Sequence, residues 1–344
     1  MKSFFKSTSM ALCAVLMATT AHADIVLINN DSGPNRGVRA AAVNYLTEQI
    51  AERTGGAVTV ENNWGAALFK TTAALESIGI GVADMGVVVG PYAQSVMPEL
   101  AMGSLVLPDA SPWVMMKAMN ELFTTNETIK ARMDEKNVVY VNHYALPPGL
   151  VACKGEGISS IEDVPGKKMA NTGGFSALFN ELGANMVSMP IYETYQATET
   201  GLVDCSVTYS YFAVATKLNE LVDTMTPVNF AAVTVVITFM NKDSFESLAP
   251  EHQQAIRDIG AEMPDYYGRT LGAADKRAME VMSTGDDAIS FSEFSAEDTE
   301  VIRKTGATVT EKWLADAKAT GLDGQAVLDE LLALIEKYKE LEPA

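Results

Sequence analysis

The sequence predicts an α/β fold of two lobes that enclose a cleft, and three observations support this expectation. Short apolar strand patterns alternate with amphipathic helix patterns from Asp24 to residue 208. Two β-rich segments, around Pro147–Pro148 and residues 229–235, are placed to cross between lobes, and the chain is helical beyond residue 250. Lobes joined by more than one strand can hinge about a cleft that holds a ligand.

The predicted elements follow each other in the order typical of mostly parallel α/β sheets. The predicted strands are 24–30, 57–63, 83–90, 137–153, 167–171, 185–190 and 202–208. The helices predicted between them are 35–56, 68–81, 175–184 and 192–201, and three more follow at 250–282, 295–317 and 324–340. Glycines end the first two helices, at Gly55–Gly56 and at Gly81. We expect one lobe from 24–147 plus about 236–275, and the other from 148–235 plus about 276–344.

Residues 1–23 have the features of a secretory signal peptide. Lys2 and Lys6 precede an apolar run that is too short to span a bilayer comfortably, and Ala21-His22-Ala23 forms the cleavage motif. We therefore expect cleavage before Asp24 and a soluble, exported, periplasmic protein.

Charge and cysteine content limit the partners. The 344 residues carry a formal net charge of −19, which disfavours nucleic acid and anionic lipid as partners. Cys153 and Cys205 remain after cleavage. In an oxidising compartment they could pair or remain as buried free thiols, because their spacing says nothing about their distance.

The sequence lacks the usual signatures of an enzyme. The mature chain has two histidines, His143 and His252, without the spacing of a zinc site. It has no G-x-S-x-G elbow, phosphate-binding loop or G-x-G-x-x-G motif. We expect a protein that is not an enzyme and uses no metal or cofactor. A hydrolase that works with Asp and Glu side chains remains an alternative.

Seven motifs, in order across nearly the whole mature chain, resemble one known family. They are ERTGGAVTVE, ALESIGIGVADMG, MPELAMGSLVLP, SSIEDVPGKKM, ELGANMVSMPIYETYQATETGLVDCSVTY, NKDSFESLAPEHQQAI and VTEKWLADAKATGLDGQAVLDELLALI. Together they are similar to the solute-binding proteins of tripartite ATP-independent periplasmic (TRAP) transporters, the dicarboxylate-type receptor family. The resemblance implies a two-lobed periplasmic binding protein fold with long C-terminal helices spanning both lobes. It also implies a small-molecule ligand and delivery to integral membrane permease subunits driven by an ion gradient. We expect the receptor to be a monomer.

The chain departs from this family at the residues that usually bind a carboxylate. The family's arginine on the strand after the EDLKG-like motif corresponds to Ala170, and a second arginine corresponds to about Gly149. Lys167 and Lys168 lie ahead of the strand tip and lack the planar guanidinium fork. A buried carboxylate without such a partner would cost several kcal/mol. We therefore expect a cleft that does not hold a carboxylate.

The residues that match family contact positions are mostly aromatic or neutral and polar. They are Asn30, Asp31, Trp64, Thr71, Val89, Tyr92, Tyr144, Phe175, Tyr192, Thr208, Tyr209 and Phe230. Aromatic faces attract ammonium groups, and Asp31 or Glu193 could supply a counter-charge. The sequence therefore predicts a small amine or amino alcohol of about ethanolamine size. Two alternatives remain: a small organic acid bound without arginine, through backbone amides, lysine or tyrosine hydroxyls, and a sensory ligand-binding module.

Overall fold

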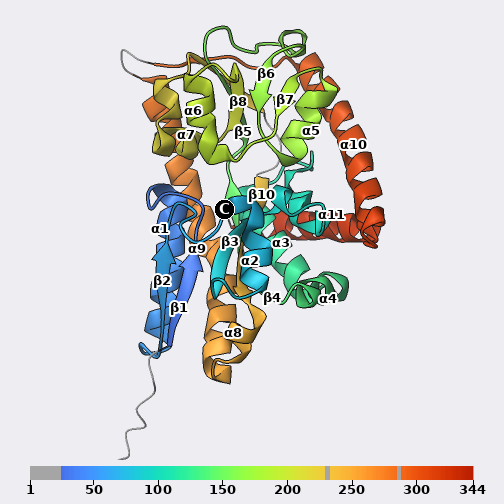
Figure 1. The fold of residues 1–344 in the computed structure, drawn as a ribbon. Coiled ribbons are helices and arrows are strands. Elements are labelled where there is room, and N and C mark those ends of the chain that lie inside the picture. Colours follow the sequence, from blue (N-terminus) through green and yellow to red (C-terminus); the bar gives the residue numbers. More distant parts are fainter. Residues whose placement is uncertain (1–24, 229–232, 285–287, 344) are drawn as a thin grey trace, which may run out of the picture.

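The computed structural model describes residues 25–228, 233–284 and 288–343. Two β-sheets flanked by helices form two lobes, one above the other (Figure 1). The predicted two-lobed α/β fold is confirmed. The expected signal peptide, residues 1–23, and Phe230 lie outside the described residues.

The first lobe contains a five-stranded sheet in the order β2-β1-β3-β10-β4. Its strands are β1 (Ile25–Asn30), β2 (Val58–Asn63), β3 (Met85–Val89), β4 (Val138–Leu146) and β10 (Val233–Asn241). β1 is parallel to β2 and β3, whereas β10 runs antiparallel to both β3 and β4. All nine residues of β10 are buried, as expected for a strand covered on both faces.

The second lobe contains a six-stranded sheet in the order β11-β9-β5-β8-β6-β7. Its strands are β5 (Gly149–Cys153), β6 (Lys168–Ala170), β7 (Asn185–Val187), β8 (Cys205–Thr208), β9 (Thr224–Val228) and β11 (Ser290–Phe291). β6 is parallel to β7 and β8, but β5 is antiparallel to β8 and β9. In each sheet the strands therefore run mostly in one direction, as the sequence predicted. The exception is the strand that enters from the other lobe, β10 in the first lobe and β5 in the second, which runs antiparallel to both of its neighbours.

Shorter helices cover the sheets. They are α1 (Gly37–Arg53), α2 (Ala74–Gly79), α3 (Pro112–Thr125), α4 (Glu127–Glu135), α5 (Gly173–Glu181), α6 (Thr194–Glu199), α7 (Ser210–Thr216) and α8 (Lys242–Glu246). Residues 112–135 form α3 and α4, two helices that were not predicted from the sequence. Each of these helices has an N-cap side chain: Ser111 accepts from the Val114 amide, and Asn126 accepts from the Ile129 amide. Short 3-10 turns complete the lobes, including η2 (Gly90–Tyr92), η3 (Pro98–Ser104) and η5 (Ile191–Glu193).

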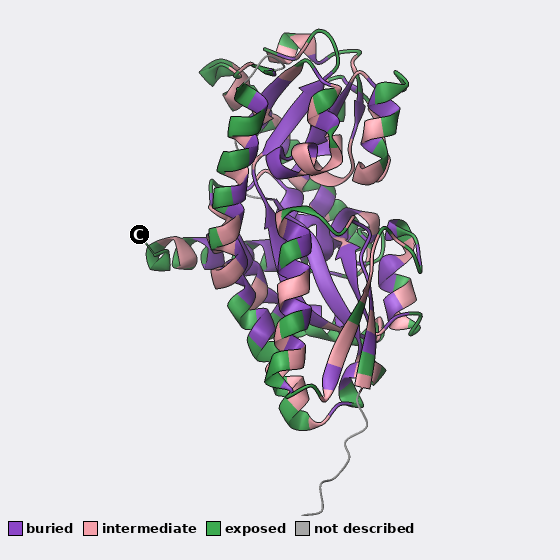
Figure 2. Ribbon diagram, turned by 90° about the vertical axis from the view of Figure 1, so that its left-hand side faces the viewer, coloured by how far each residue is buried: buried purple, intermediate pink, exposed green. Residues whose placement is uncertain are grey.

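Two long C-terminal helices, α9 (Pro250–Ser283) and α10 (Ala296–Ala319), connect the lobes, and a third, α11 (Gly324–Leu341), packs on the first lobe. α9 packs on α1 and α3 of the first lobe and on α7 of the second (Figure 1). α10 contacts both α5 and η3, and α11 packs against α3. The expected helices spanning both lobes are confirmed. The predicted domain boundaries stay a prediction, although α11 packs on the first lobe. The strands and the inward faces of these helices make up the buried core (Figure 2).

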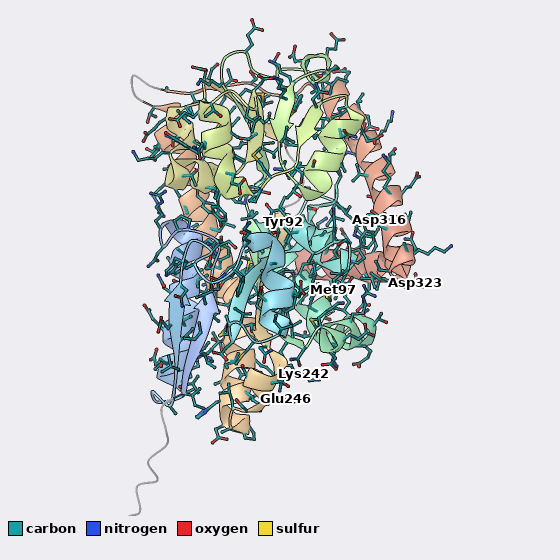
Figure 3. All side chains as sticks on the ribbon, viewed as in Figure 1. Tyr92, Met97, Lys242, Glu246, Asp316 and Asp323 are labelled. Carbon is teal, nitrogen blue, oxygen red and sulfur yellow. A yellow bond between two sulfur atoms is a disulfide. The ribbon has the colours of Figure 1, made fainter. Side chains whose placement is uncertain are left out.

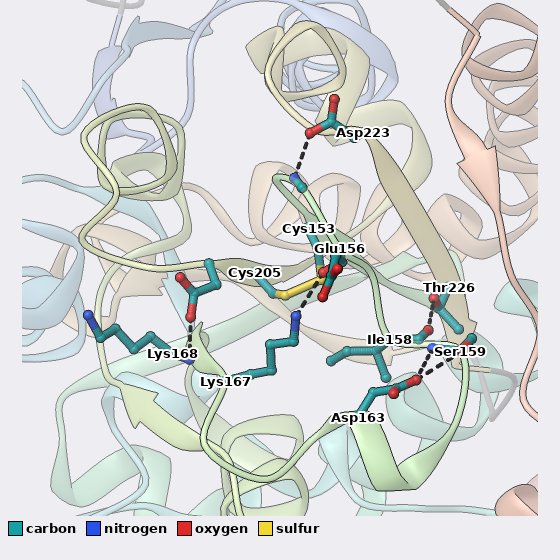
Figure 4. Close-up of a disulfide and its surroundings, with 12 residues drawn as sticks. Cys153, Glu156, Ile158, Ser159, Asp163, Lys167, Lys168, Cys205, Asp223 and Thr226 are labelled. Atoms are coloured by element: carbon teal, nitrogen blue, oxygen red, sulfur yellow. Dashed lines mark hydrogen bonds between the residues drawn. A yellow bond between two sulfur atoms is a disulfide. The ribbon is translucent and has the colours of Figure 1, made fainter.

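A disulfide joins the two cysteines of the second lobe. Cys153 of β5 and Cys205 of β8 lie directly opposite each other in an antiparallel pair, with their Cα atoms 4.0 Å apart. The bond is buried within the sheet (Figure 4). Of the two alternatives left by the sequence, the structure has the paired cysteines.

Candidate functional site

A small cavity of about 70 Å³ lies between the lobes. The first lobe contributes the ends of β3 and β4, the turn η2 and the start of β10. The second lobe contributes residues after β6, the start of α5, the turn η5 and the start of α7. Figure 3 shows Tyr92 of η2 at the end of the first lobe that faces the second. The cavity is therefore the inter-lobe cleft that the sequence predicted.

Most of the cavity wall is apolar. Its aliphatic and aromatic residues are Val87, Val89, Pro91, Leu146, Phe175, Met189, Ile191, Phe212, Val233, Val235 and Val236. Four tyrosines add rings with a polar tip: Tyr92, Tyr192, Tyr209 and Tyr211. The smaller polar residues are Ser32, Ser104, Asn171, Thr172 and Thr194. Among the described lining residues, the single charged side chain is Arg39.

Arg39 is held by a buried aspartate. Its Nη1 donates to Oδ2 of Asp31 at 2.6 Å, and its Nη2 donates to Oδ1 at 2.8 Å. The Gly33 amide also donates to Oδ1 of Asp31, at 2.7 Å. The side chain of Asp31 is 0% exposed and that of Arg39 is 9% exposed. Burial opposes the charged form of Arg39, but Asp31 more than compensates, so the pKa of Arg39 is raised.

The sequence brings these groups together through β1 and α1. Asp31 follows the last residue of β1, and Arg39 lies on the buried stripe of α1 with Val43, Leu46 and Ile50. Gly33 leaves room for the pair, because a Cβ there would lie 2.2 Å from Nη2 of Arg39. That Cβ would also lie 2.7 Å from the hydroxyl of Tyr192, so the guanidinium and this hydroxyl converge on one place.

The tyrosine hydroxyls around the cavity remain protonated at neutral pH. Burial raises the pKa of Tyr92 and of Tyr211 to about 12. Burial also raises the pKa of Tyr192 and of Tyr209. These hydroxyls can therefore donate hydrogen bonds to an acceptor in the cavity.

The structure brings five of the twelve predicted contact residues to the cavity. They are Val89, Tyr92, Phe175, Tyr192 and Tyr209. Six others do not line it: Asn30, Asp31, Trp64, Thr71, Tyr144 and Thr208.

Local packing accounts for several of these placements. The amide group of Asn30 accepts from the Leu68 amide and donates to the Phe69 carbonyl, so it ties down the segment after β2. Asp31 is fully buried on the side of Arg39 that faces away from the cavity. Tyr144 is fully buried against Tyr267, with ring centroids 5.3 Å apart. Trp64 is partly buried and packs against the main hydrophobic core.

The small residues at the two positions matched to family arginines pack against their neighbours. Ala170 is buried in a small cluster with Ala197 and Val203. The side chain that reaches the cavity from this strand end is Asn171, whose amide donates to the Val207 carbonyl at 3.0 Å. A Cβ at Gly149 would lie 2.9 Å from the ring of Phe175.

The cavity does have a guanidinium in its wall, that of Arg39, which was not among the predicted contact residues. Lys167 does not take the place of the family's arginine in the cavity. Its ammonium group donates to the Glu156 carbonyl beside the disulfide (Figure 4). A signal for Arg39 was present in the sequence. It stands in register with the apolar residues of α1, where an arginine is unusual unless it is paired.

Comparison with known proteins identifies the family. Residues 30–316 match the bacterial extracellular solute-binding protein family 7. The chain belongs to this family. It is 27% identical to a solute-binding protein of Albidiferax ferrireducens over 251 residues, which is 71% of each chain.

Solved TRAP solute-binding proteins have the same fold. One from Rhodoferax ferrireducens, in complex with copurified benzoate, has a TM-score of 0.81 at 20% identity and covers 92% of this chain and 99% of its own. Another, from a marine metagenome and specific for aromatic acid ligands, was co-crystallised with 3-hydroxybenzoate. It has a TM-score of 0.80 at 23% identity over 92% of this chain and 99% of its own.

The chain is therefore a member of a family of bacterial extracellular solute-binding proteins, and the solved proteins that share its fold are TRAP solute-binding proteins. This family consists of solute-binding receptors rather than enzymes. Within the described ranges, no helix has the length and apolar content needed to cross a bilayer. The same ranges contain no group of three His, Cys, Asp or Glu side chains arranged to hold a metal ion.

Proposed function

We propose that this receptor binds a small organic acid with an apolar body, encloses it between the lobes and delivers it to the permease. The observation that carries the proposal is the position of Arg39. It is the one charged side chain among the described residues of the cavity wall, and its charge is positive.

Arg39 retains donors for a ligand although it is paired with Asp31. A guanidinium has five N–H groups, and the two contacts to Asp31 use two of them. The hydroxyl of Tyr192 lies next to the same guanidinium. A carboxylate at this end of the cavity would accept charge-assisted hydrogen bonds from both groups.

The same residues disfavour binding of a cationic ligand. It would meet the positive charge of Arg39 first, while both oxygens of Asp31 already accept hydrogen bonds from Arg39 and Gly33. The amine hypothesis rested on the absence of a guanidinium, and Arg39 removes that basis. The first of the two alternatives, a small organic acid, becomes the better hypothesis, with Arg39 of α1 as the group that pairs with its carboxylate.

The rest of the cavity suits an apolar body. Aliphatic and aromatic side chains dominate the wall, and such surfaces favour apolar groups over additional polar ones. Since one water needs roughly 10–15 Å³, the cavity admits a molecule of several non-hydrogen atoms. The benzoate and 3-hydroxybenzoate found in two proteins of the same fold have this chemistry, which supports the proposal without identifying the ligand.

A thermal-shift screen of matched acids and amines tests the proposal. Benzoate and benzylamine have a similar shape and opposite charge, and aliphatic pairs such as butyrate and butylamine extend the comparison. We expect acids to raise the melting temperature and the amines to leave it unchanged. Stabilisation by amines alone would reject the proposal.

The control is a variant in which both members of the ion pair are neutral, Asp31→Asn with Arg39→Gln. It removes the charge without leaving an unpaired buried ion, so we expect it to fold and to lose the response to acids. An unchanged response to acids would mean that Arg39 does not hold the carboxylate.

A further inference from the structure

One wall of the cavity is a direct contact between the lobes. Gly174, in the first turn of α5 in the second lobe, donates its amide to Oγ of Ser104 at 3.1 Å. Ser104 ends η3 of the first lobe, and its hydroxyl donates to the Ala101 carbonyl at 2.8 Å. The hydroxyl is therefore fixed by its own lobe and presents an oxygen to the other.

The contact leaves no space for a side chain at the first two positions of α5, Gly173 and Gly174. A Cβ at Gly174 would lie 1.9 Å from the backbone oxygen of Ser104 and 2.7 Å from its carbonyl carbon. A Cβ at Gly173 would lie 2.6 Å from Cγ of Pro91, and Gly173 also has a positive φ of 68°. Real Cβ atoms do not approach other heavy atoms this closely, and neither the Ser104 backbone nor the Pro91 ring is the end of a flexible side chain. The two lobes can therefore meet here only because both residues are glycines.

The same residues bound the ligand cavity. Pro91 and Ser104 line it from the first lobe, and Thr172 and Phe175 line it from the second. The amide of Gly174 already donates its hydrogen bond to Ser104 and is not available to a ligand. A ligand therefore meets a closed wall on this side, and its charged end is left to the Arg39 side of the cavity.

We propose that Gly173, Gly174 and Ser104 form a closure seam that sets how far the lobes approach and so how large a ligand they enclose. The seam is a positioning device that acts through the two lobes. It depends on the receptor having a cleft, which the family establishes, and not on the ligand being an acid.

The variant Gly174→Ala tests the seam, and Gly272→Ala is its matched control. Gly272 lies within α9 and a Cβ there meets no atom within 4 Å, so its substitution adds a methyl group to open space. Gly174 has no positive φ, so alanine is compatible with α5 itself and interferes only when the lobes close. Circular dichroism and the melting temperature check that both variants fold.

The readouts on ligand-free protein are the radius of gyration from X-ray scattering and amide hydrogen exchange. For G174A we expect a larger radius than for wild type and G272A, with faster exchange in residues 171–175. S104A removes the acceptor without a steric clash, so we expect faster exchange of the Gly174 amide and little change in radius. A G174A protein with the radius and exchange rates of G272A would overturn the proposal.

The affinity for benzoate, used as a probe ligand, provides a second test of the closure seam. If benzoate binds wild type, we expect its affinity for G174A to fall by at least about tenfold, because the closed state becomes less populated. Equal affinity for G174A and G272A would also overturn the seam. A failure of benzoate to bind would count against the proposed ligand class. The closure seam would then be tested by the scattering and hydrogen-exchange measurements on ligand-free protein.

Discussion

The guanidinium of Arg39 and the carboxylate of Asp31 form a two-point ion pair, at 2.6 and 2.8 Å, at the boundary of the ligand cavity. The arginine faces the cavity while the aspartate is fully buried behind it. The pair is neutral as a whole but presents its positive member to the ligand. A receptor arranged in this way can keep an arginine in a closed, apolar cleft without leaving its charge unpaired.

Removing the charge of Asp31 alone should separate the structural and binding roles of this pair. For Asp31→Asn we expect the free energy of unfolding to fall by about 3–5 kcal/mol, because Arg39 is left as an uncompensated buried charge. An acid ligand then becomes the only counter-ion, so benzoate should recover more stability in D31N than in wild type. Urea denaturation with and without benzoate measures both effects.

Asp265→Asn is the control for D31N. Asp265 pairs with Lys117 at 2.8 Å but its side chain is 45% exposed, so its loss should cost at most about 1 kcal/mol. Equal losses in D31N and D265N would argue against a buried pair at Arg39.

The hydroxyl of Tyr192 should contribute to binding an acid. Tyr192→Phe keeps the ring and removes one donor beside Arg39, so we expect the affinity for an acid ligand to fall roughly tenfold. Tyr195→Phe, one helical turn further and outside the cavity wall, should leave affinity unchanged. Calorimetric titration compares them, and equal affinities of Y192F and Y195F would exclude the hydroxyl from recognition.

The disulfide should stabilise the second lobe. Its cysteines are 52 positions apart, for which the chain-entropy model gives about 4 kcal/mol. We expect a reductant to lower the denaturation midpoint of wild type, and the double variant Cys153→Ala with Cys205→Ala to be less stable and insensitive to reductant. A wild-type midpoint that is the same with and without reductant would show that the bond contributes little.

Stability should decrease in mild acid because of His143. Burial lowers the pKa of this imidazole to about 3 from its usual 6.5. Between these two pH values the unfolded chain binds a proton that the folded chain does not, so folding is favoured as pH rises. This one residue should cost about 2 kcal/mol of unfolding free energy between pH 7 and pH 5.

Denaturation of variants at both pH values isolates this effect. His143→Gln should show a pH dependence smaller by that amount, whereas His252→Gln, at a partly exposed position, should resemble wild type. The same dependence in H143Q and wild type would contradict the assignment.

The sequence was sufficient for the fold because most elements carry strong local signals. The alternation from β1 to α6 follows apolar patterning, and Pro147–Pro148 marks the change from β4 to β5. The reversed direction of β5 and β10 was not visible in the sequence, since strand direction depends on which lobe each segment joins. For the same reason the disulfide could not be predicted, because only the antiparallel register of β5 and β8 sets Cys153 opposite Cys205.

The site was harder to predict because its charge comes from an unexpected element. Matching positions to the family drew attention to Ala170, which faces a small core cluster rather than the cavity. The positive charge comes instead from α1, eight residues after Asp31. Aromatic positions near strand ends were more informative: Tyr92, Phe175 and Tyr209 all line the cavity.

The most direct test of the proposed ligand class is a crystal structure of the receptor with the molecule it retains on purification or with a stabilising acid from the screen. We predict a carboxylate within hydrogen-bonding distance of Arg39 and the Tyr192 hydroxyl, with its apolar part against the valines of β3 and β10. An ammonium group in the cavity, or a carboxylate held elsewhere while Arg39 contacts Asp31 alone, would contradict this account.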